Sequence, residues 1–402
     1  MDDAPRPAGV RRAGSVPRSV WALGLVSLLM DTSSKMVQGL LPVFLVSVLG
    51  ASVFSVGVIE GIAEATAAFT RLLSGALSDR LGRRKLLVVA GYGLAAVIKP
   101  LFAMAASVGW VLLARFLDRV GKGIRVAPRD ALIADLAPTA VHGASYGLRQ
   151  SLDSVGAFAG PLIAMGLMVL LDDDMRSVFW IAFIPAILAV LVLSGAVREP
   201  RKARTKASRP PRVRRERVAD LSREFWVVLA VATTLTLARF SEAFLVLRAS
   251  GLGLAPGLAP GVLVVMNVAY AASAYPAGRR SDRVGRWGVL AAGVATLIGA
   301  DILLAVSGSL ATAAAGAALW GLHMGMTQGL LTTLVADSVP GELLGTAFGL
   351  FHFSSGVALL AASVLAGWLW EVFGAPAPFV AGAVLSSVTL LGIRVRGWRN
   401  RG

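Results

Sequence analysis

The sequence GALSDRLGRR at residues 75–84 recurs as GRRSDRVGRW at 278–287, and LIADLAPTAVHGASYGL at 132–148 recurs as LVADSVPGELLGTAFGL at 334–350. The separation between copies is the same in both cases to within one residue. Two independent matches at one separation indicate that a single unit was duplicated in the same orientation. The sequence therefore predicts two similar halves, with a binding site expected between them.

The composition predicts a membrane protein. The chain has 402 residues, of which 56% are hydrophobic and 15% charged, which is more apolar side chain than one soluble core could enclose. The net charge of +16 resides in short segments between apolar runs, without a basic domain, so nucleic acid is not an expected partner. Because the chain has no cysteine and only three scattered histidines, we expect neither disulfides nor a bound metal.

Apolar runs of membrane-spanning length predict twelve helices. Those of the first half lie near 20–48, 53–78, 86–106, 109–135, 145–171 and 176–196. Those of the second half lie near 224–249, 258–278, 287–307, 311–336, 346–370 and 378–394. The expected fold class is an all-α membrane protein of 12 transmembrane helices in two pseudo-symmetric six-helix bundles.

Lys and Arg gather in alternate connections between the spans, which predicts that these connections face the cytoplasm. Both termini are also basic and are expected on the same side. The segment 198–223 carries eleven Lys and Arg with three prolines, as is typical of a solvated linker. The predicted organisation is a cytoplasmic tail (1–18), an N-terminal bundle (19–197), a basic cytoplasmic linker (198–223), a C-terminal bundle (224–396) and a cytoplasmic tail (397–402).

The motif at 75–84 combines glycines with charges at a helix end. Gly75 is expected to allow close helix approach and Gly82 to permit a turn. The motif resembles the signature loop of the major facilitator superfamily, and the second copy fits equally well. In that superfamily the loop acts as a cytoplasmic latch, so the resemblance implies a gating role for these residues. They are Gly75, Asp79, Arg80, Gly82, Arg83, Arg84, Gly278, Asp282, Arg283, Gly285 and Arg286.

The fifth predicted helix carries Gly147, Gly156, Gly160 and Pro161. Gly156 and Gly160 form a face of small residues suited to close helix packing, and Pro161 removes a backbone donor. This spacing resembles the antiporter signature of the same superfamily, which would imply export. Ordinary helix packing is the alternative explanation.

The fourth predicted helix is the most highly charged. Arg115, Asp118, Arg119, Lys122 and Arg129 fall within about one third of its circumference, and Arg125 lies at the edge of that sector. Such a face cannot contact lipid, so it is expected to line a cavity. The alternative is a structural network of ion pairs with the first, second or fifth helix.

Carboxylates on the first two helices are candidates for proton coupling. Asp31 and Lys35 are four residues apart and are expected to pair, with Gln38 on the same helix. Buried carboxyl groups suit proton binding and release. The proton-coupling candidates are Asp31, Glu60, Glu64 and Asp118. These carboxylates could instead permanently neutralise the fourth helix. The stretches 31–42 and 59–65 resemble a bacterial branch of the superfamily regarded as efflux proteins.

The second half has fewer charges within its spans. Arg239 and Glu242 are expected to pair, and His323 is interpreted first as a packing residue that could titrate. The candidates for lining the substrate cavity, taken over both halves, are Lys35, Gln38, Arg119, Lys122, Arg125, Arg239, Glu242, Asn267, Tyr270, His323 and Gln328.

The sequence therefore predicts a secondary active transporter that moves a small solute by alternating access, with proton-coupled efflux as the leading hypothesis. The alternatives are uptake or exchange of organic anions, and a non-transporting membrane sensor. No nucleophile–base arrangement, phosphate loop or metal cluster stands out, so we expect neither an enzyme nor a cofactor. The expected partners are a small substrate, with an anion as one alternative, protons and lipid, for a monomer in the bacterial inner membrane.

Overall fold

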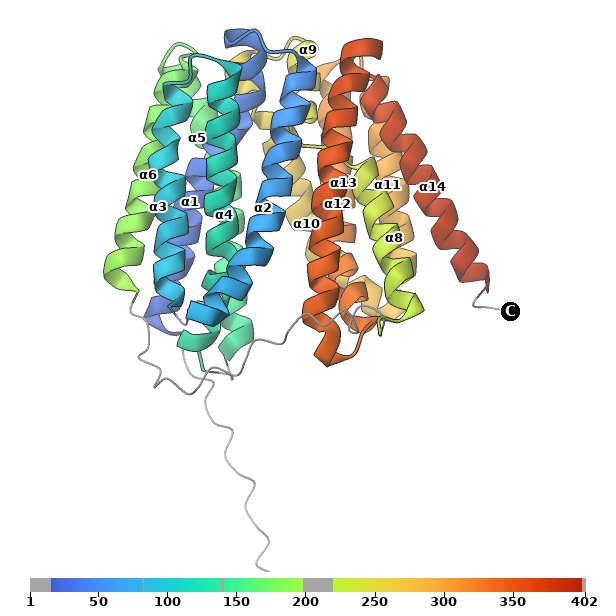
Figure 1. Ribbon diagram of the computed structural model, residues 1–402. Helices are drawn as coiled ribbons and strands as arrows, with labels where there is room; N and C mark the ends of the chain where they lie inside the picture. Colours follow the sequence, from blue (N-terminus) through green and yellow to red (C-terminus); the bar gives the residue numbers. More distant parts are fainter. Residues whose placement is uncertain (1–15, 82, 139–140, 198–219, 400–402) are drawn as a thin grey trace, which may run out of the picture.

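A computed structural model describes residues 16–81, 83–138, 141–197 and 220–399, which form two helical bundles side by side (Figure 1). The N-terminal bundle contains α1 (Arg18–Val43), a π-helical turn η1 (Phe44–Val48), α2 (Val53–Leu81), α3 (Arg84–Ala103), α4 (Val108–Leu136), α5 (His142–Leu170) and α6 (Met175–Ala196). The C-terminal bundle contains α8 (Arg223–Ala238), α9 (Ala243–Gly251), the short turn η3 (Pro256–Leu258), α10 (Gly261–Val284), α11 (Arg286–Ala305), α12 (Leu310–Asp337), the turn η4 (Gly341–Leu343), α13 (Leu344–Phe373) and α14 (Ala377–Arg399).

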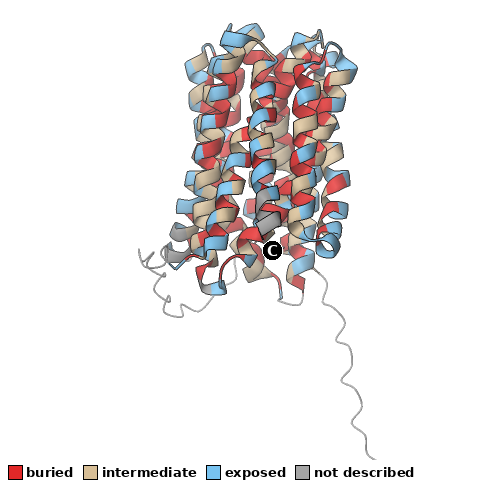
Figure 2. Ribbon diagram, turned by 90° about the vertical axis from the view of Figure 1, so that its right-hand side faces the viewer, coloured by how far each residue is buried: buried red, intermediate tan, exposed pale blue. Residues whose placement is uncertain are grey.

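The helices have the length and surface of membrane-spanning elements. Ten of the described helical segments are long and apolar enough to cross a membrane. α4 and α12 are similarly long but are not among these ten, and both pack against other helices of their own bundle. Large apolar side chains such as those of Val97, Leu170 and Leu391 are exposed. Exposed positions recur along the outward sides of the helices, where lipid would cover them (Figure 2). The predicted all-helical membrane fold with twelve crossings is confirmed, with α8 and α9 counted as one crossing.

The crossing expected at 224–249 is interrupted near its middle. α8 ends at Ala238 and α9 begins at Ala243, and Arg239 after the break has the non-helical angles φ −111° and ψ 94°. The sequence did not predict this break, because the segment contains neither proline nor glycine. The interruption frees backbone groups inside the bundle.

Polar side chains at loop ends explain where several helices begin. The hydroxyl of Ser222 accepts from the Phe225 N–H at 3.0 Å at the start of α8, and Ser309 with Thr312 forms a capping box at the start of α12. Asp174 caps α6, and its pKa lies below the ordinary value, mainly because the Ser177 hydroxyl donates to its carboxylate.

Glycines allow α1 and α5 to pack closely. A Cβ atom at Gly156 would lie 2.5 Å from the carbonyl oxygen of Leu28, and one at Gly160 would lie 2.6 Å from that of Thr32. Only glycine permits this approach. Gly147 has no other atom within 4 Å of its Cβ position, so it takes no part in this packing.

The two bundles contact each other most closely at the end opposite to the repeated motifs. A Cβ atom at Gly57 of α2 would lie 2.3 Å from the carbonyl oxygen of Ser363 on α13. On the other side, Gly39 of α1 lies against Pro260, which precedes α10. These contacts close the predicted outer side and leave the polar interior between the bundles nearer the motif-bearing end.

Replacement of Gly156 by alanine is expected to destabilise the protein by about 1–3 kcal/mol, because the added methyl group overlaps the Leu28 carbonyl. Gly147→Ala is the matched control on the same helix and should stabilise slightly, since alanine favours a helix by about 1 kcal/mol over glycine. Thermal unfolding in detergent measures both. Equal melting temperatures for the two variants would contradict the close-packing interpretation.

Candidate functional site

Two cavities of about 380 and 220 Å³ lie between the bundles, and a third of about 200 Å³ adjoins them and is lined by α1, α4 and α5 of the N-terminal bundle. Lys122 of α4 lines all three of them, so we treat them together as the central cavity. Side chains from α2 and α4 of one bundle face side chains from α8, α12 and α13 of the other. A small solute in this position would contact both halves of the molecule.

Two parallel ion pairs join α2 to α4 beside the cavity. Arg115 donates to Glu60 at 2.9 Å, and Arg119 lies 3.1 Å from Glu64. Both partners advance by four residues, because parallel neighbouring helices repeat their contacts each turn. The first pair is buried, whereas the side chain of Glu64 is 29% exposed to the cavity.

A third pair joins α3 to α4. The ammonium group of Lys99 donates to Asp118 at 2.9 Å and to the hydroxyl of Ser34 at 3.2 Å. Both charged side chains are almost fully buried. Three of the four carboxylates considered for proton coupling, Glu60, Glu64 and Asp118, therefore already hold a cation.

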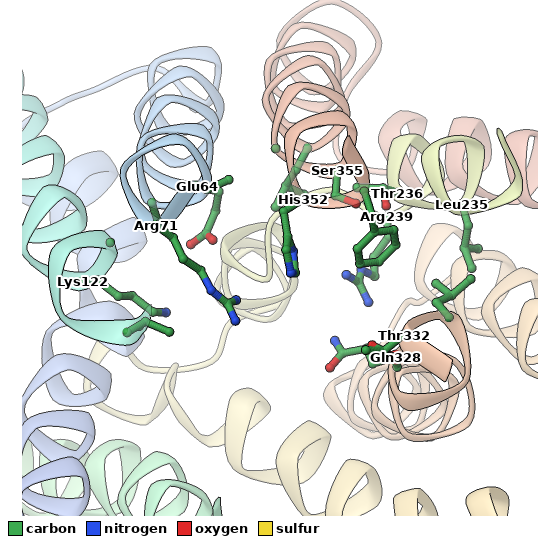
Figure 3. A pocket seen from close by; sticks show the side chains of 18 residues that line it. Glu64, Arg71, Lys122, Leu235, Thr236, Arg239, Gln328, Thr332, His352 and Ser355 are labelled. Atoms are coloured by element: carbon green, nitrogen blue, oxygen red, sulfur yellow. Dashed lines mark hydrogen bonds between the residues drawn. The ribbon is translucent and has the colours of Figure 1, made fainter. Parts of the chain in front are cut away.

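Three cations line the 380 Å³ cavity, and none of them has a carboxylate within ion-pair distance among the described residues: Arg71, Lys122 and Arg239. Figure 3 shows Arg71 and Lys122 on one side of the cavity and Arg239 on the other, pointing into the space between the bundles. On α2, the positions that follow Glu64 toward Lys122 are Ala67 and Ala68. The pairs Glu60–Arg115 and Glu64–Arg119 form a ladder along α2 and α4. This ladder has no carboxylate at its next step.

Two expected ion pairs are wrong. Lys35 does not pair with Asp31, and Arg239 does not pair with Glu242. Instead Lys35 and Glu242 approach each other at 3.6 Å across the two bundles. Asp31 lines the 200 Å³ cavity and forms no ion pair among the described residues. Spacing within one helix indicated the wrong partners, because Lys35 and Glu242 are brought together by contact between the two bundles.

Most cavity candidates line the central cavity, namely Lys35, Gln38, Arg119, Lys122, Arg125, Arg239, Glu242 and Gln328. Arg125 also stacks on the ring of Tyr92, with 4.7 Å between guanidinium carbon and ring centre. Asn267, Tyr270 and His323 do not line it. His323 is fully buried, and its Nδ1 lies 2.8 Å from the Gly293 carbonyl oxygen, so it packs α12 against α11.

The repeated motifs pair with each other within each half. Arg84 lies 2.8 Å from Asp135, and Arg286 pairs with Asp337. Gly285 ends α10 with φ +89°, a conformation that requires glycine. Gly75 makes only ordinary contact and Gly278 has open space, so neither provides the close approach expected of Gly75.

The first copy of the motif is only partly described. Gly82 and the side chains of Asp79 and Arg80 lie outside the described residues. In the same region Arg83 precedes α3, and in the second copy Asp282 and Arg283 lie in the last turn of α10.

Several cavity residues were not among the predicted candidates. Arg71, Thr236, His352 and Ser355 line the 380 Å³ cavity. Arg71 lies seven residues after Glu64, which places both on one face of α2, so helical periodicity could have identified it. The others lie on α8 and α13, which pack against each other within the C-terminal half, and no local pattern indicates this contact.

The geometry is that of a two-bundle membrane protein with a charged cavity between its halves. The family model of the Major Facilitator Superfamily matches residues 23–351 and 243–400. The chain belongs to the major facilitator superfamily. The resemblance inferred from the repeated motifs is thereby confirmed.

Relatives within the superfamily cover nearly the whole chain. An uncharacterized MFS-type transporter of Methanocaldococcus jannaschii is 29% identical over 92% of this chain and 93% of its own length. The inner membrane transport protein YajR of Escherichia coli is 25% identical over 97% of this chain and 84% of its own length. The protein is thus a multi-pass membrane protein and a transporter of the superfamily.

Solved structures of the superfamily share this fold. The nucleoside transporter NupG has a TM-score of 0.76 at 12% identity and covers 94% of this chain and 99% of its own. The human organic anion transporter MFSD10 has a TM-score of 0.65 at 19% identity, with coverage of 94% and 99%. At these identities the likeness concerns the fold alone.

Replacement of Asp118 by asparagine is expected to lower the free energy of unfolding by about 3–5 kcal/mol, because Lys99 would keep a buried charge without its partner. The double variant Lys99→Met with Asp118→Leu should recover most of that loss, since apolar side chains of similar size can replace a buried pair. Thermal unfolding in detergent measures the series. A double variant as unstable as Asp118→Asn would show that the pair is not the cause.

Proposed function

We propose that this superfamily member transports a small organic anion, which binds in the central cavity between the two bundles. The observation that carries the proposal is that the three cations lining the 380 Å³ cavity, Arg71, Lys122 and Arg239, have no carboxylate partner in the described chain. Among the carboxylates that line the 380 and 220 Å³ cavities are Glu64 and Glu242, which are already paired with Arg119 and Lys35.

An anion would complete this arrangement. Ionisable side chains deep in a membrane protein are costly unless they are paired or line a water-filled cavity. The guanidinium groups of Arg71 and Arg239 can each bind a carboxylate or phosphate with two hydrogen bonds, and Lys122 adds a point charge. A solute with one or two anionic groups therefore matches the charge of the site better than a cation or a neutral molecule does.

The same placement supports alternating access. Arg239 belongs to the C-terminal bundle, whereas Arg71 and Lys122 belong to the N-terminal bundle. An anion held by both would draw the motif-bearing ends together, and the contacts at Gly57 and Gly39 on the opposite side would have to open in return. This role in both halves favours a transporter over a non-transporting sensor.

Lys122→Gln and Arg239→Gln are each expected to weaken anion binding by at least about tenfold, or about 1.4 kcal/mol. The probes are matched pairs that differ in charge: adenosine 5′-monophosphate against adenosine, and benzoate against benzamide. Thermal stabilisation of the purified protein measures binding.

Arg223→Gln, an exposed cation at the start of α8, is the control and should leave binding unchanged. Equal stabilisation by the anionic and neutral member of each pair, or unchanged affinity in both cavity variants, would refute the anion hypothesis.

Proton coupling is the second part of the proposal, and Glu64 with Asp31 carries it. Glu64 is the partly exposed member of the ladder, so a proton could reach it and release Arg119 toward the cavity. Asp31 lines the cavity without an ion pair in the described chain. Glu60 and Asp118 are buried in their pairs and are assigned to the structure. Export of the anion in exchange for protons is the direction we propose.

Glu64→Gln and Asp31→Asn are expected to abolish solute flux driven by a pH gradient in proteoliposomes, while exchange of labelled for unlabelled solute persists. Exchange needs binding and alternating access but no net proton movement, so it serves as the internal control. The assay uses whichever anionic probe the binding measurements identify. Full pH-driven flux in both variants would exclude these carboxylates as the coupling sites.

We further propose that the protein works as a monomer in the bacterial cytoplasmic membrane with both termini in the cytoplasm. The basic connections at the motif-bearing end support this orientation, because Lys and Arg are retained on the cytoplasmic side. The central cavity then faces the cytoplasm, as loading for export requires.

A further inference from the structure

A buried aspartate lies outside the central cavity and has no role in the transport scheme. Asp301 of α11 is 0% exposed. Neither of its carboxylate oxygens has a hydrogen-bond partner, and no described cation forms an ion pair with it. Such a group inside a membrane protein is costly, so something must satisfy it.

The carboxylate lies beside the break in the seventh crossing. The Cβ position of Gly382 on α14 is 2.6 Å from Asp301 Oδ2 and 3.0 Å from the carbonyl oxygen of Ala238, the last residue of α8. In the described chain no backbone N–H beyond α8 donates to this carbonyl. Two unsatisfied oxygens from different helices therefore flank the same point, and only glycine on α14 leaves room for them.

A third oxygen comes from α14. Ser386 lies one helical turn after Gly382 and hence on the same face of the helix. Its side chain is 0% exposed, and its hydroxyl also lacks a hydrogen-bond partner. Carboxylate, carbonyl and hydroxyl oxygens are the ligands of hard cations.

We propose that a sodium ion binds between Asp301, the Ala238 carbonyl and Ser386. The C-terminal end of α8 carries a partial negative charge that adds to the carboxylate, and unwound carbonyls at half-helix ends are suited to sodium. One carboxylate neutralises one monovalent cation. A divalent ion would leave net positive charge near the apolar rings of Phe240, in the break, and Phe379, on α14, which meet edge to face with their centres 5.3 Å apart.

The proposed sodium site is adjacent along the chain to a residue of the central cavity. Arg239, one of the unpaired cavity cations, immediately follows Ala238. An ion that ties the end of α8 to α11 and α14 would fix the backbone from which Arg239 projects. Sodium would thus order one of the anion-binding groups from outside the cavity, in a way that does not depend on which solute is carried.

The test titrates the purified protein with NaCl, with choline chloride keeping the ionic strength constant, and follows thermal unfolding. The melting temperature of the wild type should rise with sodium and saturate. Asp301→Asn, which keeps the shape of the side chain, should remove the response. Ser386→Ala should raise the half-saturating sodium concentration by about tenfold.

Ser363→Ala is the matched control, because Ser363 is an equally buried serine without a hydrogen-bond partner on α13, where its carbonyl faces Gly57 of α2. It should retain the wild-type response to sodium. If Asp301→Asn fails to fold, the comparison of Ser386→Ala with Ser363→Ala decides the question. A wild-type melting temperature that does not change with sodium would overturn the proposal. This holds also if Asp301→Asn proves more stable than the wild type. These outcomes are independent of anion binding.

Discussion

The need to neutralise charge inside a membrane governs this structure. α4 carries more charges than any span could expose to lipid, and the protein pairs them with α2 and α3: Glu60 with Arg115, Glu64 with Arg119, and Lys99 with Asp118. Breaking a buried pair leaves an uncompensated charge, so these contacts fix how the three helices pack. The same rule identifies the site, because three cations without a carboxylate partner among the described residues line one cavity.

The two halves are built to move as units. Within each half, the repeated motifs close on each other through Arg84 with Asp135 and Arg286 with Asp337. Between the halves, close contacts depend largely on glycine and backbone, as at Gly57. Contacts of this kind can separate without leaving a charge unpaired, whereas the ion pair between Lys35 and Glu242, at 3.6 Å, would have to open. The buried ion pairs of α4 therefore lie within one half, as expected if each half moves as a rigid body in the alternating access that we propose.

The sequence predicted the features that depend on periodicity and duplication. The twelve crossings, the two bundles and the charged face of α4 follow from apolar runs and from repeats that any reader of the chain can align. Partners across helices could not be predicted in the same way. Lys35 finds Glu242 in the other half, and no spacing within α1 indicates this. Arg71 was not among the predicted cavity residues, although it lies seven residues after Glu64 on the same face of α2.

The break in the seventh crossing is a feature that depends on contacts between helices and that the local sequence does not predict. Residues 237–243 read LARFSEA, a sequence that could continue a helix. In the folded chain Phe240 packs against Trp320, and the hydroxyl of Ser241 lies 3.4 Å from the Glu60 carboxylate that also holds Arg115. The Glu60 carboxylate thus contacts both Arg115 in the N-terminal half and Ser241 at the break in the other half. In the alternating access that we propose, separation of the halves near Glu60 would break its contact with Ser241 and leave that with Arg115, which would couple the backbone beside Arg239 to the movement.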